Sequence, residues 1–267
     1  MSVPLFSGSV PLTRLAHAPS GYLDCVLGAP DVAGTARPGQ FVMVGLPGRT
    51  DPLLARPFDI VEVFPETGEF RLIIKVVGKA TRLLKELGPG DRLTVTGPLG
   101  KPITDYSFSS LALLVRGCGA AAVLFFLQEA RRNNIRVHTV LSAATEEKLI
   151  CRSEIAALSD SIHFATDDGS LGEKLLGTEV LRRVLSEHHV ERVYSCGGGP
   201  FYQPYLEEIE KSGALPVYLF LESYMACGFG ACHGCAVKKR EGGYALVCQD
   251  GPLFRLRDIA DPCLIYQ

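Results

Sequence analysis

Short apolar runs separated by turn residues make up the first part of the chain. Val, Ile, Leu and Phe are frequent in residues 21–27, 40–46, 58–63, 70–77 and 92–96. Turn signals such as Pro38-Gly39 and Pro89-Gly90-Asp91 stand between these runs. Several short strands with regular turns are typical of a small antiparallel barrel. The pattern predicts one helical insertion, over residues 80–87, which Gly88 closes.

The pattern changes after Tyr106, where strand-like and helix-like segments alternate. Buried strands are expected at residues 111–115, 137–142, 162–165, 190–195 and 216–221. Helices are expected at residues 120–132, 155–158, 180–187 and 202–211. Such repeated βα units predict a doubly wound parallel sheet, with ligands at the carboxyl ends of its strands.

The chain is therefore expected to have three parts. Residues 1–106 form an antiparallel β-barrel domain, residues 107–221 an α/β doubly wound parallel-sheet domain, and residues 222–267 a C-terminal cysteine module. A length of 267 residues, with 47% apolar and 21% charged residues, supplies enough material for two compact domains and an appendage.

Charge and hydropathy exclude several classes of partner. The net charge of −2 gives no electrostatic reason to expect nucleic acid or an anionic membrane. The N-terminus lacks the basic start and long apolar core of a signal peptide. The most apolar stretch, residues 111–127, is short and is interrupted by Arg116, Gly117 and Gly119, so it is not expected to span a bilayer. The protein is expected to be soluble and cytoplasmic.

Nine cysteines are many for a cytoplasmic chain, and four of them lie between residues 227 and 248. A secreted disulfide framework would spread its cysteines through a short, loop-rich domain, which this chain does not do. The four are therefore interpreted as metal ligands in a reducing compartment. The sequence assigns no role to four of the scattered cysteines: Cys25, Cys118, Cys151 and Cys263.

Cys227, Cys232 and Cys235 have the C-x4-C-x2-C spacing typical of plant-type [2Fe–2S] ferredoxins, and Cys248 supplies a fourth ligand. The intervening glycines, Gly228, Gly230 and Gly234, would let the backbone approach the cluster and adopt the positive φ angles that a tight loop requires.

Two other metal centres use cysteine ligands. A structural zinc site is one, but zinc ribbons use paired C-x2-C knuckles and only one of the gaps here fits. A Rieske centre is the other, but it needs two histidine ligands and this loop offers only His233, which we expect to pack or to face solvent.

Residues 222–235 read ESYMACGFGACHGC and residues 247–254 read VCQDGPLF. Together they resemble the C-terminal module of the electron-transfer subunits of class 1B dihydroorotate dehydrogenases, which belong to the ferredoxin–NADP reductase superfamily. The resemblance extends over nearly the whole chain, and includes residues 38–43, 56–58, 97–100 and 166–170. The cysteine module with its Asp-Gly-Pro segment is its most specific part.

The resemblance implies an FAD site on the barrel. Arg56 would pair with the pyrophosphate, for which a planar guanidinium is well suited, and Phe58 would lie against the isoalloxazine ring beside Pro57. Asp59 stands where the superfamily has Ser or Thr, near the flavin N5. Taken without the resemblance, Arg56 could instead make a surface ion pair with Asp59.

Two further flavin contacts are implied along the barrel. The second falls on Ile73, Ile74 and Lys75, of which the two isoleucines would otherwise be read as plain core residues. The third falls on Ala80 and Thr81, where the superfamily has Gly-Thr at a helix start, whose free N–H groups suit phosphate.

The resemblance also implies a nicotinamide site. Gly117 and Gly119 lie in the first turn of the α/β domain, and Cys196 and Gly197 match a Cys-Gly turn whose cysteine approaches the nicotinamide; Cys196 is the candidate catalytic residue. Residues 143–147 lack the basic side chains that a 2′-phosphate needs, although Lys148 follows directly. Acidic groups suit a free ribose hydroxyl, so NAD is favoured over NADP.

By resemblance, electrons pass between NAD(H), FAD and the [2Fe–2S] cluster, to or from an FMN-containing dihydroorotate dehydrogenase catalytic subunit, in pyrimidine biosynthesis. The implied assembly is a heterotetramer. The nearest rival is a similar small subunit attached to a bifurcating transhydrogenase, a hydrogenase or a sulfite reductase. A rival of another class is a zinc-binding interaction module without redox activity.

Overall fold

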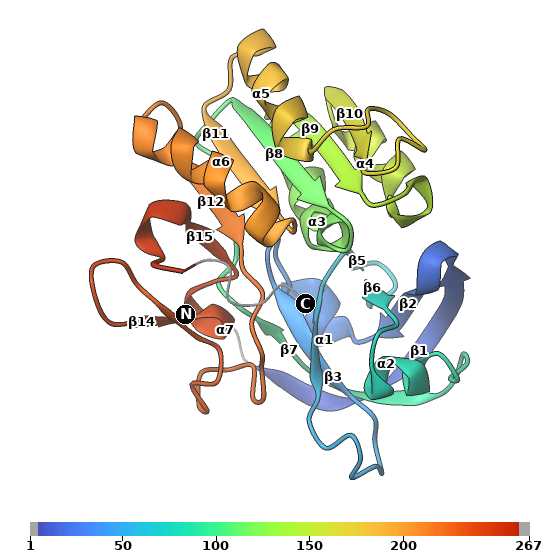
Figure 1. Ribbon diagram of the computed structural model, residues 1–267. Helices are drawn as coiled ribbons and strands as arrows, with labels where there is room; N and C mark the ends of the chain where they lie inside the picture. Colours follow the sequence, from blue (N-terminus) through green and yellow to red (C-terminus); the bar gives the residue numbers. More distant parts are fainter. Residues whose placement is uncertain (1–4, 262–267) are drawn as a thin grey trace.

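A computed structural model of the chain describes residues 5–261, so Cys263 lies outside the described residues. The N-terminal part contains a seven-stranded antiparallel sheet in the order β4-β3-β7-β1-β2-β6-β5 (Figure 1). Its strands are β1 (Phe6–Ala18), β2 (Tyr22–Gly28), β3 (Phe41–Gly45), β4 (Arg56–Asp59), β5 (Glu62–Phe64), β6 (Glu69–Lys75) and β7 (Arg92–Leu99). The predicted antiparallel barrel is confirmed.

The two edge strands of this sheet, β4 and β5, follow one another in the chain. The backbone N–H of Ile60 donates to the carbonyl of Gln40 at 3.1 Å, and that of Val61 donates to the carbonyl of Arg71 at 3.0 Å. The chain therefore passes from the β3 side of the sheet to the β6 side at this point and partly closes the barrel. The prediction of one continuous strand over residues 58–63 was wrong for this reason.

The side chains of strand β6 alternate between the barrel core and the opposite face of the sheet. Phe70, Leu72 and Ile74 are at most 1% exposed and lie in the barrel core. The alternate residues, Arg71, Ile73 and Lys75, point to the other face of the sheet, because successive side chains of a strand alternate. This second face is covered by the α/β domain.

Two barrel helices accompany the strands. Helix α2 (Lys79–Leu84) corresponds to the predicted helical insertion but starts one residue earlier and ends sooner. Helix α1 (Pro30–Thr35) and strand β1 were not predicted as separate elements. Six residues are too few to show helical periodicity, and β1 carries Pro11 and a register shift between Leu12 and Arg14, which obscure its alternation.

The second part is an α/β sheet in the order β10-β9-β8-β11-β12-β15. Its parallel strands are β8 (Ser110–Arg116), β9 (Arg136–Ala143), β10 (Ser161–Thr166), β11 (Arg192–Cys196) and β12 (Val217–Phe220). Helices α3 (Gly119–Arg132) and α4 (Arg152–Leu158) pack on one face, and α5 (Gly177–Glu187) and α6 (Gly199–Ser212) on the other (Figure 1). The predicted doubly wound sheet is confirmed.

The C-terminal segment is built into this second sheet. It contains β13 (Ala236–Lys238), β14 (Tyr244–Leu246), α7 (Val247–Asp250) and β15 (Leu253–Arg255). Strand β15 pairs antiparallel with β12, from Tyr218–Arg255 to Phe220–Leu253. The cysteine module is therefore anchored to the α/β domain through backbone hydrogen bonds.

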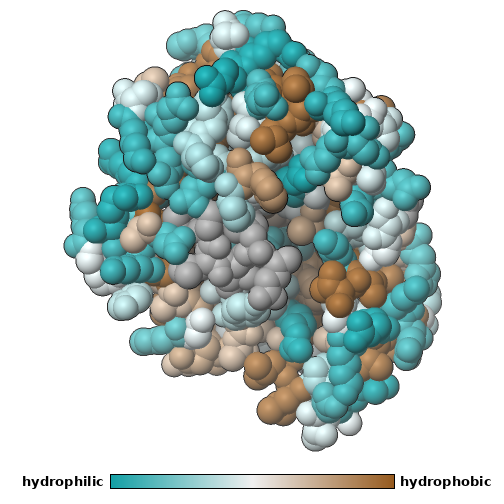
Figure 2. Space-filling model, viewed as in Figure 1, coloured by the Kyte–Doolittle hydropathy of each residue, from teal (hydrophilic) through white to brown (hydrophobic). Residues whose placement is uncertain are grey.

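The two domains also exchange core residues. Val61 of the barrel packs in the cluster formed around α3, and Phe125 of α3 packs in the barrel core. Figure 2 shows that hydrophilic residues cover most of the visible face, with apolar residues in small separate groups. No described helix has the length and apolar character needed to cross a membrane.

A pair of stacked histidines lies at the edge of the α/β domain. The His138 ring of β9 is 7% exposed and stacks on the His188 ring, with centroids 3.9 Å apart. Burial, and then the neighbouring His188, lower the pKa of His138 below its usual value of 6.5, although Asp160 opposes the shift. The folded protein therefore holds His138 neutral over a pH range in which the unfolded chain would bind a proton.

We expect the free energy of unfolding to fall as pH decreases from about 7.5 to 5.5, because the unfolded state then takes up a proton that folded His138 excludes. The stabilisation is fully present above 6.5 and is lost as pH falls toward the lowered pKa. Denaturant unfolding of the wild type and of His138→Phe, which keeps an aromatic ring at the stack, checks this. The variant should show a shallower pH dependence, and equal slopes would contradict the assignment.

Candidate functional site

Two cavities meet between the barrel and the α/β domain. The first, of about 340 Å³, is lined by residues of β4, β6 and α2 and by residues 221–225. The second, of about 470 Å³, lies at the carboxyl ends of β8, β9 and β11, as predicted for a doubly wound sheet. Lys75, Cys118 and Glu222 line both cavities. Ligands in the two cavities would therefore touch the same three side chains.

Most of the residues expected at the flavin line the first cavity. They are Arg56, Pro57, Phe58, Asp59, Ile73, Lys75, Ala80 and Thr81. Ile74 is the exception: it is 1% exposed and packs in the barrel core, so only its backbone could face a ligand. The alternation of β6 explains the difference, since Ile73 and Lys75 share the opposite face.

Arg56 is held at the first cavity by the backbone around it. Its guanidinium donates hydrogen bonds to the carbonyls of Leu54 and Ala55, the latter at 3.3 Å. Within residues 5–261 no ion pair joins Arg56 to Asp59, so the alternative of a surface pair between them is not observed. The guanidinium is therefore available for an anionic group in the cavity, whereas the Lys79 ammonium group, which also lines it, pairs with Asp51.

Thr81 organises the start of α2 beside the same cavity. Its hydroxyl accepts hydrogen bonds from the backbone N–H groups of Val77 and Gly78, both at 3.0 Å, and donates to the Gly78 carbonyl. Ala80 is 8% exposed, and its small side chain takes up little room in this part of the cavity wall. The hydroxyl of Thr81 thus fixes the loop, rather than pointing freely into the cavity.

Two carboxyl groups and one ammonium group gather where the cavities meet. Burial, and then repulsion from Glu222, raise the pKa of Asp59 to about 7 from its usual 3.8. Burial also raises the pKa of Glu222, while Lys75 opposes that shift. Asp59 is half-buried, whereas Glu222 is exposed and lines both cavities. Asp59 is therefore expected to be partly protonated near neutral pH.

The second cavity is lined by Gly117 and Gly197 of the two glycine turns, as predicted, but not by Gly119. A Cβ atom at Gly119 would lie 2.7 Å from the Cys196 carbonyl oxygen and 2.8 Å from its Sγ atom. Gly119 therefore permits the close packing of α3 on the end of β11. Gly197 has a φ of +80°, which favours glycine at this turn.

Cys196, the predicted catalytic residue, is 2% exposed and lines neither cavity. Cys118 lines both and is the thiol that faces a ligand there. Burial raises the pKa of each thiol, and Glu222 adds to both shifts, so neither is a thiolate at neutral pH. No local pattern distinguishes Cys118, because a cysteine in a glycine turn is equally compatible with plain packing.

Residues around the end of β9 would meet the far part of a dinucleotide. Lys148 lines the second cavity, while the Glu146 carboxylate pairs with Arg152 at 2.6 Å. The Ser20 hydroxyl of the barrel donates to the Glu147 carbonyl at 2.9 Å. The wall also contains two exposed aromatic residues that sequence reasoning did not select, Phe201 and Tyr224, which are 67% and 61% exposed.

The loop that carries the first three cysteines packs tightly on the barrel. Gly228 has a φ of +81°, and a Cβ atom there would lie 2.5 Å from Met43 Cγ of β3. Gly230 also has a positive φ, as predicted, but Gly234 does not; His233 takes the left-handed conformation instead, with a φ of 57°. The expectation for Gly234 was therefore wrong, and His233 faces solvent.

The four predicted ligands form two pairs at different depths. Cys235 and Cys248 are buried, with their sulfur atoms 3.2 Å apart. Cys227 and Cys232 lie nearer the surface, and the Cys232 N–H donates to Cys227 Sγ at 3.4 Å. Burial alone would raise the pKa of Cys227, but backbone N–H groups directed at its sulfur, led by that of Cys232, lower it to about 7.

This arrangement fits a two-iron cluster better than a single ion. Within residues 5–261 no three His, Cys, Asp or Glu side chains converge on one point that could hold a metal ion. Two thiolate pairs, one for each iron, with N–H groups aimed at the sulfurs, are the donor set that a [2Fe–2S] centre requires.

Residues 222–260 match the iron–sulfur cluster binding domain of dihydroorotate dehydrogenase B, and residues 27–103 match the oxidoreductase FAD-binding domain. The dihydroorotate dehydrogenase B (NAD(+)) electron transfer subunit of Desulforamulus reducens is 36% identical, over 85% of this chain and 87% of that protein. The corresponding subunit of Bacillus caldolyticus is also 36% identical, over 84% of this chain and 86% of that protein.

The chain belongs to the family of dihydroorotate dehydrogenase B electron transfer subunits. Among solved structures, an NADH-dependent reduced ferredoxin–NADP oxidoreductase has a TM-score of 0.85 at 27% identity, over 94% of this chain and 89% of its own. The cytochrome b5 reductase domain of Ulva prolifera nitrate reductase has a TM-score of 0.63 at 17% identity, over 77% and 90%, and so shares the fold.

The two matched segments coincide with the two halves of the site. The FAD-binding segment contains every barrel residue that lines the first cavity, from Phe41 to Thr81. The iron–sulfur segment begins at Glu222, which lines both cavities, and includes the four cysteines. The barrel wall of the first cavity therefore lies within the matched FAD-binding segment, and the cysteine module within the matched iron–sulfur segment.

Replacing Arg56 by Ala should weaken FAD retention while leaving the fold intact, because within residues 5–261 the guanidinium bonds only to the adjacent Leu54 and Ala55 carbonyls, and Arg56 lines the cavity. Loss of a charged hydrogen-bonding partner costs about 1.5–3 kcal/mol, or about ten- to a hundredfold in affinity. Flavin content after extensive dialysis measures the effect. Arg49→Ala, an exposed arginine outside the cavity, is the control, and equal flavin content in both variants would refute the assignment.

Metal analysis of anaerobically purified protein should give about two iron per chain, as a [2Fe–2S] cluster requires. Cys235→Ser should abolish the cluster signal in electron paramagnetic resonance of the reduced protein. Cys151→Ser, at a thiol outside the cysteine module, should retain it. Stoichiometric zinc without iron would overturn the cluster assignment.

Proposed function

We propose that this chain passes electrons between NAD(H), FAD and a [2Fe–2S] cluster, to or from an FMN-containing dihydroorotate dehydrogenase catalytic subunit in pyrimidine biosynthesis. The four ligands would be Cys227, Cys232, Cys235 and Cys248. The proposal rests chiefly on one observation: three sites follow one another without a gap. The second cavity shares three side chains with the first, and the first shares β3 with the cluster loop.

The contact between flavin cavity and cluster runs along one face of β3. Phe41 lines the first cavity, and Met43, two residues later on the same face, meets Gly228 of the cluster loop. Met225 also lines the cavity, two residues before Cys227. Both connections place the cluster loop beside the wall of the flavin cavity, which supports the proposed transfer of electrons from flavin to cluster.

Each part of the chain has a distinct role in this proposal. Bound flavin takes up electrons in pairs and releases them singly, which links a hydride donor to an iron–sulfur acceptor. Arg56 binds the pyrophosphate, and Phe58 and Ile73 enclose the ring. Asp59, with a pKa of about 7, holds or releases a proton beside the ring at neutral pH.

At the nicotinamide side, Gly117 and Gly197 let the dinucleotide approach the ends of β8 and β11. Cys196 is the candidate catalytic residue by resemblance. Because it is buried against Gly119, it would act by shaping the turn around Gly119, while Cys118 is the thiol that lines the nicotinamide cavity. NAD is favoured over NADP because Glu146 and Glu147 stand at the end of β9.

The relatives are named as subunits of dihydroorotate dehydrogenase B that use NAD(+). An electron transfer subunit requires a catalytic partner, here proposed to be the FMN-containing subunit in a heterotetramer. The eight cysteines of the described residues are all free thiols, which suits a reducing compartment such as the cytoplasm.

A second candidate is the small subunit of a flavin-bifurcating transhydrogenase. It is favoured by the TM-score of 0.85 to the NADH-dependent reduced ferredoxin–NADP oxidoreductase, but the 27% identity there is lower than the 36% to the dihydroorotate dehydrogenase B subunits. Copurification of the native complex separates the two, because the partner subunits differ.

The isolated protein should oxidise NADH with an artificial acceptor dye and should not act on dihydroorotate, because its two matched segments are an FAD-binding domain and an iron–sulfur cluster binding domain, and the dihydroorotate site is proposed to lie in the catalytic subunit. Dihydroorotate:NAD activity should appear when the FMN subunit is added. Steady-state assays of the isolated chain and of the mixture check this. Dihydroorotate oxidation by this chain alone, or failure of the two proteins to copurify, would overturn the subunit assignment.

A further inference from the structure

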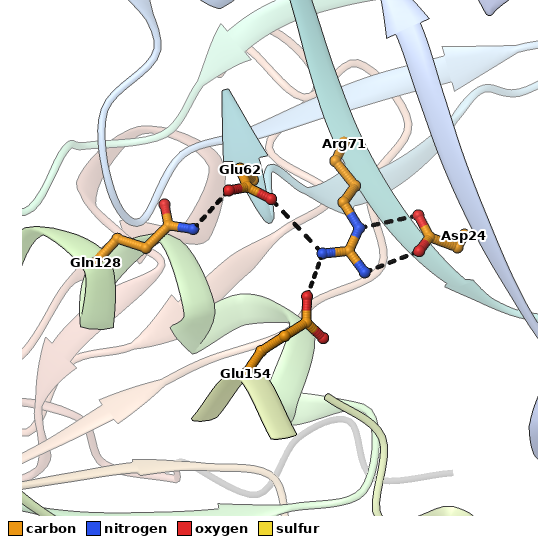
Figure 3. A network of polar contacts seen from close by, with 5 residues as sticks. All are labelled: Asp24, Glu62, Arg71, Gln128 and Glu154. Atoms are coloured by element: carbon orange, nitrogen blue, oxygen red, sulfur yellow. Dashed lines mark hydrogen bonds and ion pairs between the residues drawn. The ribbon is translucent and has the colours of Figure 1, made fainter. Parts of the chain in front are cut away.

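A guanidinium with three carboxylate partners lies at the junction of the two domains (Figure 3). Arg71 of β6 forms a bidentate pair with Asp24 of β2, with distances of 2.9 and 2.8 Å. Its third nitrogen lies 3.6 Å from Glu62 of β5 and forms a short ion pair with Glu154 of α4. Gln128 of α3 donates to Glu62 at 3.0 Å.

The junction connects the barrel to the α/β domain twice. Arg71, Asp24 and Glu62 come from the barrel, whereas Glu154 and Gln128 come from the second domain. The Arg71 side chain is only 12% exposed, and those of Asp24, Glu62 and Glu154 are 23%, 30% and 42% exposed. The site is therefore partly shielded from water, and its charges interact more strongly than those of a surface pair.

Arg71 supplies the positive charge that keeps the three carboxylates of the junction close to one another. One positive charge holds three carboxylates together, so without it Glu154 would face Asp24 and Glu62 across the domain boundary with like charge. Such repulsion acts along the direction that separates β6 from α4. The guanidinium replaces this repulsion with attraction because its planar fork can meet several carboxylates at once.

Both sides of the junction continue directly into the two cavities. On the barrel side, Ile73 and Lys75 follow Arg71 on the same face of β6, and they line the flavin cavity. On the other side, Glu154 lies six residues after Lys148, which lines the second cavity. A smaller cavity of about 210 Å³ between them is lined by Tyr22, Arg71, Ile73, Cys151 and Glu154, among others.

We propose that Arg71 is a positioning residue for hydride transfer: through Glu154 it fixes β6 against α4, and so fixes the flavin cavity relative to the nicotinamide cavity. This inference rests on the proposed function, since it takes the two cavities as the sites of FAD and NAD(H). Arg71 lines neither of those two cavities and acts only through Ile73, Lys75 and the segment around Lys148.

Hydride transfer is sensitive to such an arrangement. A displacement of about 1 Å between reacting groups can cost about a hundredfold in rate, whereas binding of each cofactor to its own domain is little affected. Loss of the junction should therefore lower the rate of flavin reduction by NADH and leave FAD content, iron content and NADH affinity almost unchanged.

The test compares flavin reduction by NADH in stopped-flow experiments on the whole FAD- and cluster-loaded chain. Arg71→Met should reduce the limiting rate by about tenfold or more, with the NADH dissociation constant changed by no more than about twofold. Arg183→Met is the matched control, because Arg183 makes a similar bidentate pair with Glu173 inside the α/β domain. The limiting rate of flavin reduction in Arg183→Met should equal that of the wild type.

Glu154→Gln gives a more specific test. Its effect on the limiting rate of flavin reduction should be a decrease when residue 71 is Arg and an increase when residue 71 is Met. In the wild type it removes an attraction and should lower the rate. In Arg71→Met it removes a repulsion and should restore part of the lost rate, as should added salt, because Glu154 is 42% exposed. A side chain with a merely structural role would show neither the sign change nor the salt rescue.

Hydrogen–deuterium exchange gives a measurement independent of turnover. In Arg71→Met, amides of residues 69–75 and 146–158 should exchange faster, and those of the cysteine module should not change. If Arg71→Met does not fold, Glu154→Gln carries the test: an unchanged limiting rate there overturns the inference, and so does a wild-type rate in Arg71→Met. A wild-type protein that binds FAD but is not reduced by NADH instead contradicts the proposed function.

Discussion

The two-residue repeat of strand β6 is the constraint on which the arrangement of this protein depends. Its pleat sends Phe70, Leu72 and Ile74 into the barrel core and leaves Arg71, Ile73 and Lys75 on the opposite face. That face meets the second domain, so one strand supplies the domain junction, a wall of the flavin cavity and a charge shared by both cavities. A register shift of one residue would bury Lys75 and expose the core.

The cluster loop depends on the barrel in a comparable way. Gly228 lies so close to Met43 that no side chain fits between them, and Phe41, Met43 and Leu99 of the barrel pack in the same apolar cluster as Cys235 and Cys248. Strand β15 then ties the module to the α/β sheet. The cluster is therefore fixed against both domains, which keeps its distance from the flavin cavity constant.

Two carboxyl groups and one ammonium group determine the charge where the two cavities meet. Asp59, Lys75 and Glu222 line the flavin cavity, and burial raises the pKa of Asp59 to about 7, so Asp59 titrates near neutral pH. A Ser or Thr at position 59, as in the wider superfamily, would offer a hydroxyl but no titrating proton. The substitution by Asp thus changes the proton chemistry beside the flavin without changing the shape of the fold.

The sequence alone determined both sheet types, the change from barrel to βα repeats after Tyr106 and the candidate ligands, because alternation, βα repeats and cysteine spacing are local properties of the chain. It could not show that residues 58–63 split into two strands, since that break depends on hydrogen bonds to Gln40 and Arg71, distant in sequence.

Only the tertiary structure decided which side chains face the cavities. Cys118 rather than Cys196 lines the cavities, the Ile74 side chain lies in the barrel core, and His233 takes the left-handed backbone expected at Gly234. The tertiary structure also places Arg71 next to Glu154, which is 83 residues later in the chain. No local sequence pattern relates these two residues. Positions of this kind depend on how domains pack, and packing is a property of the whole chain.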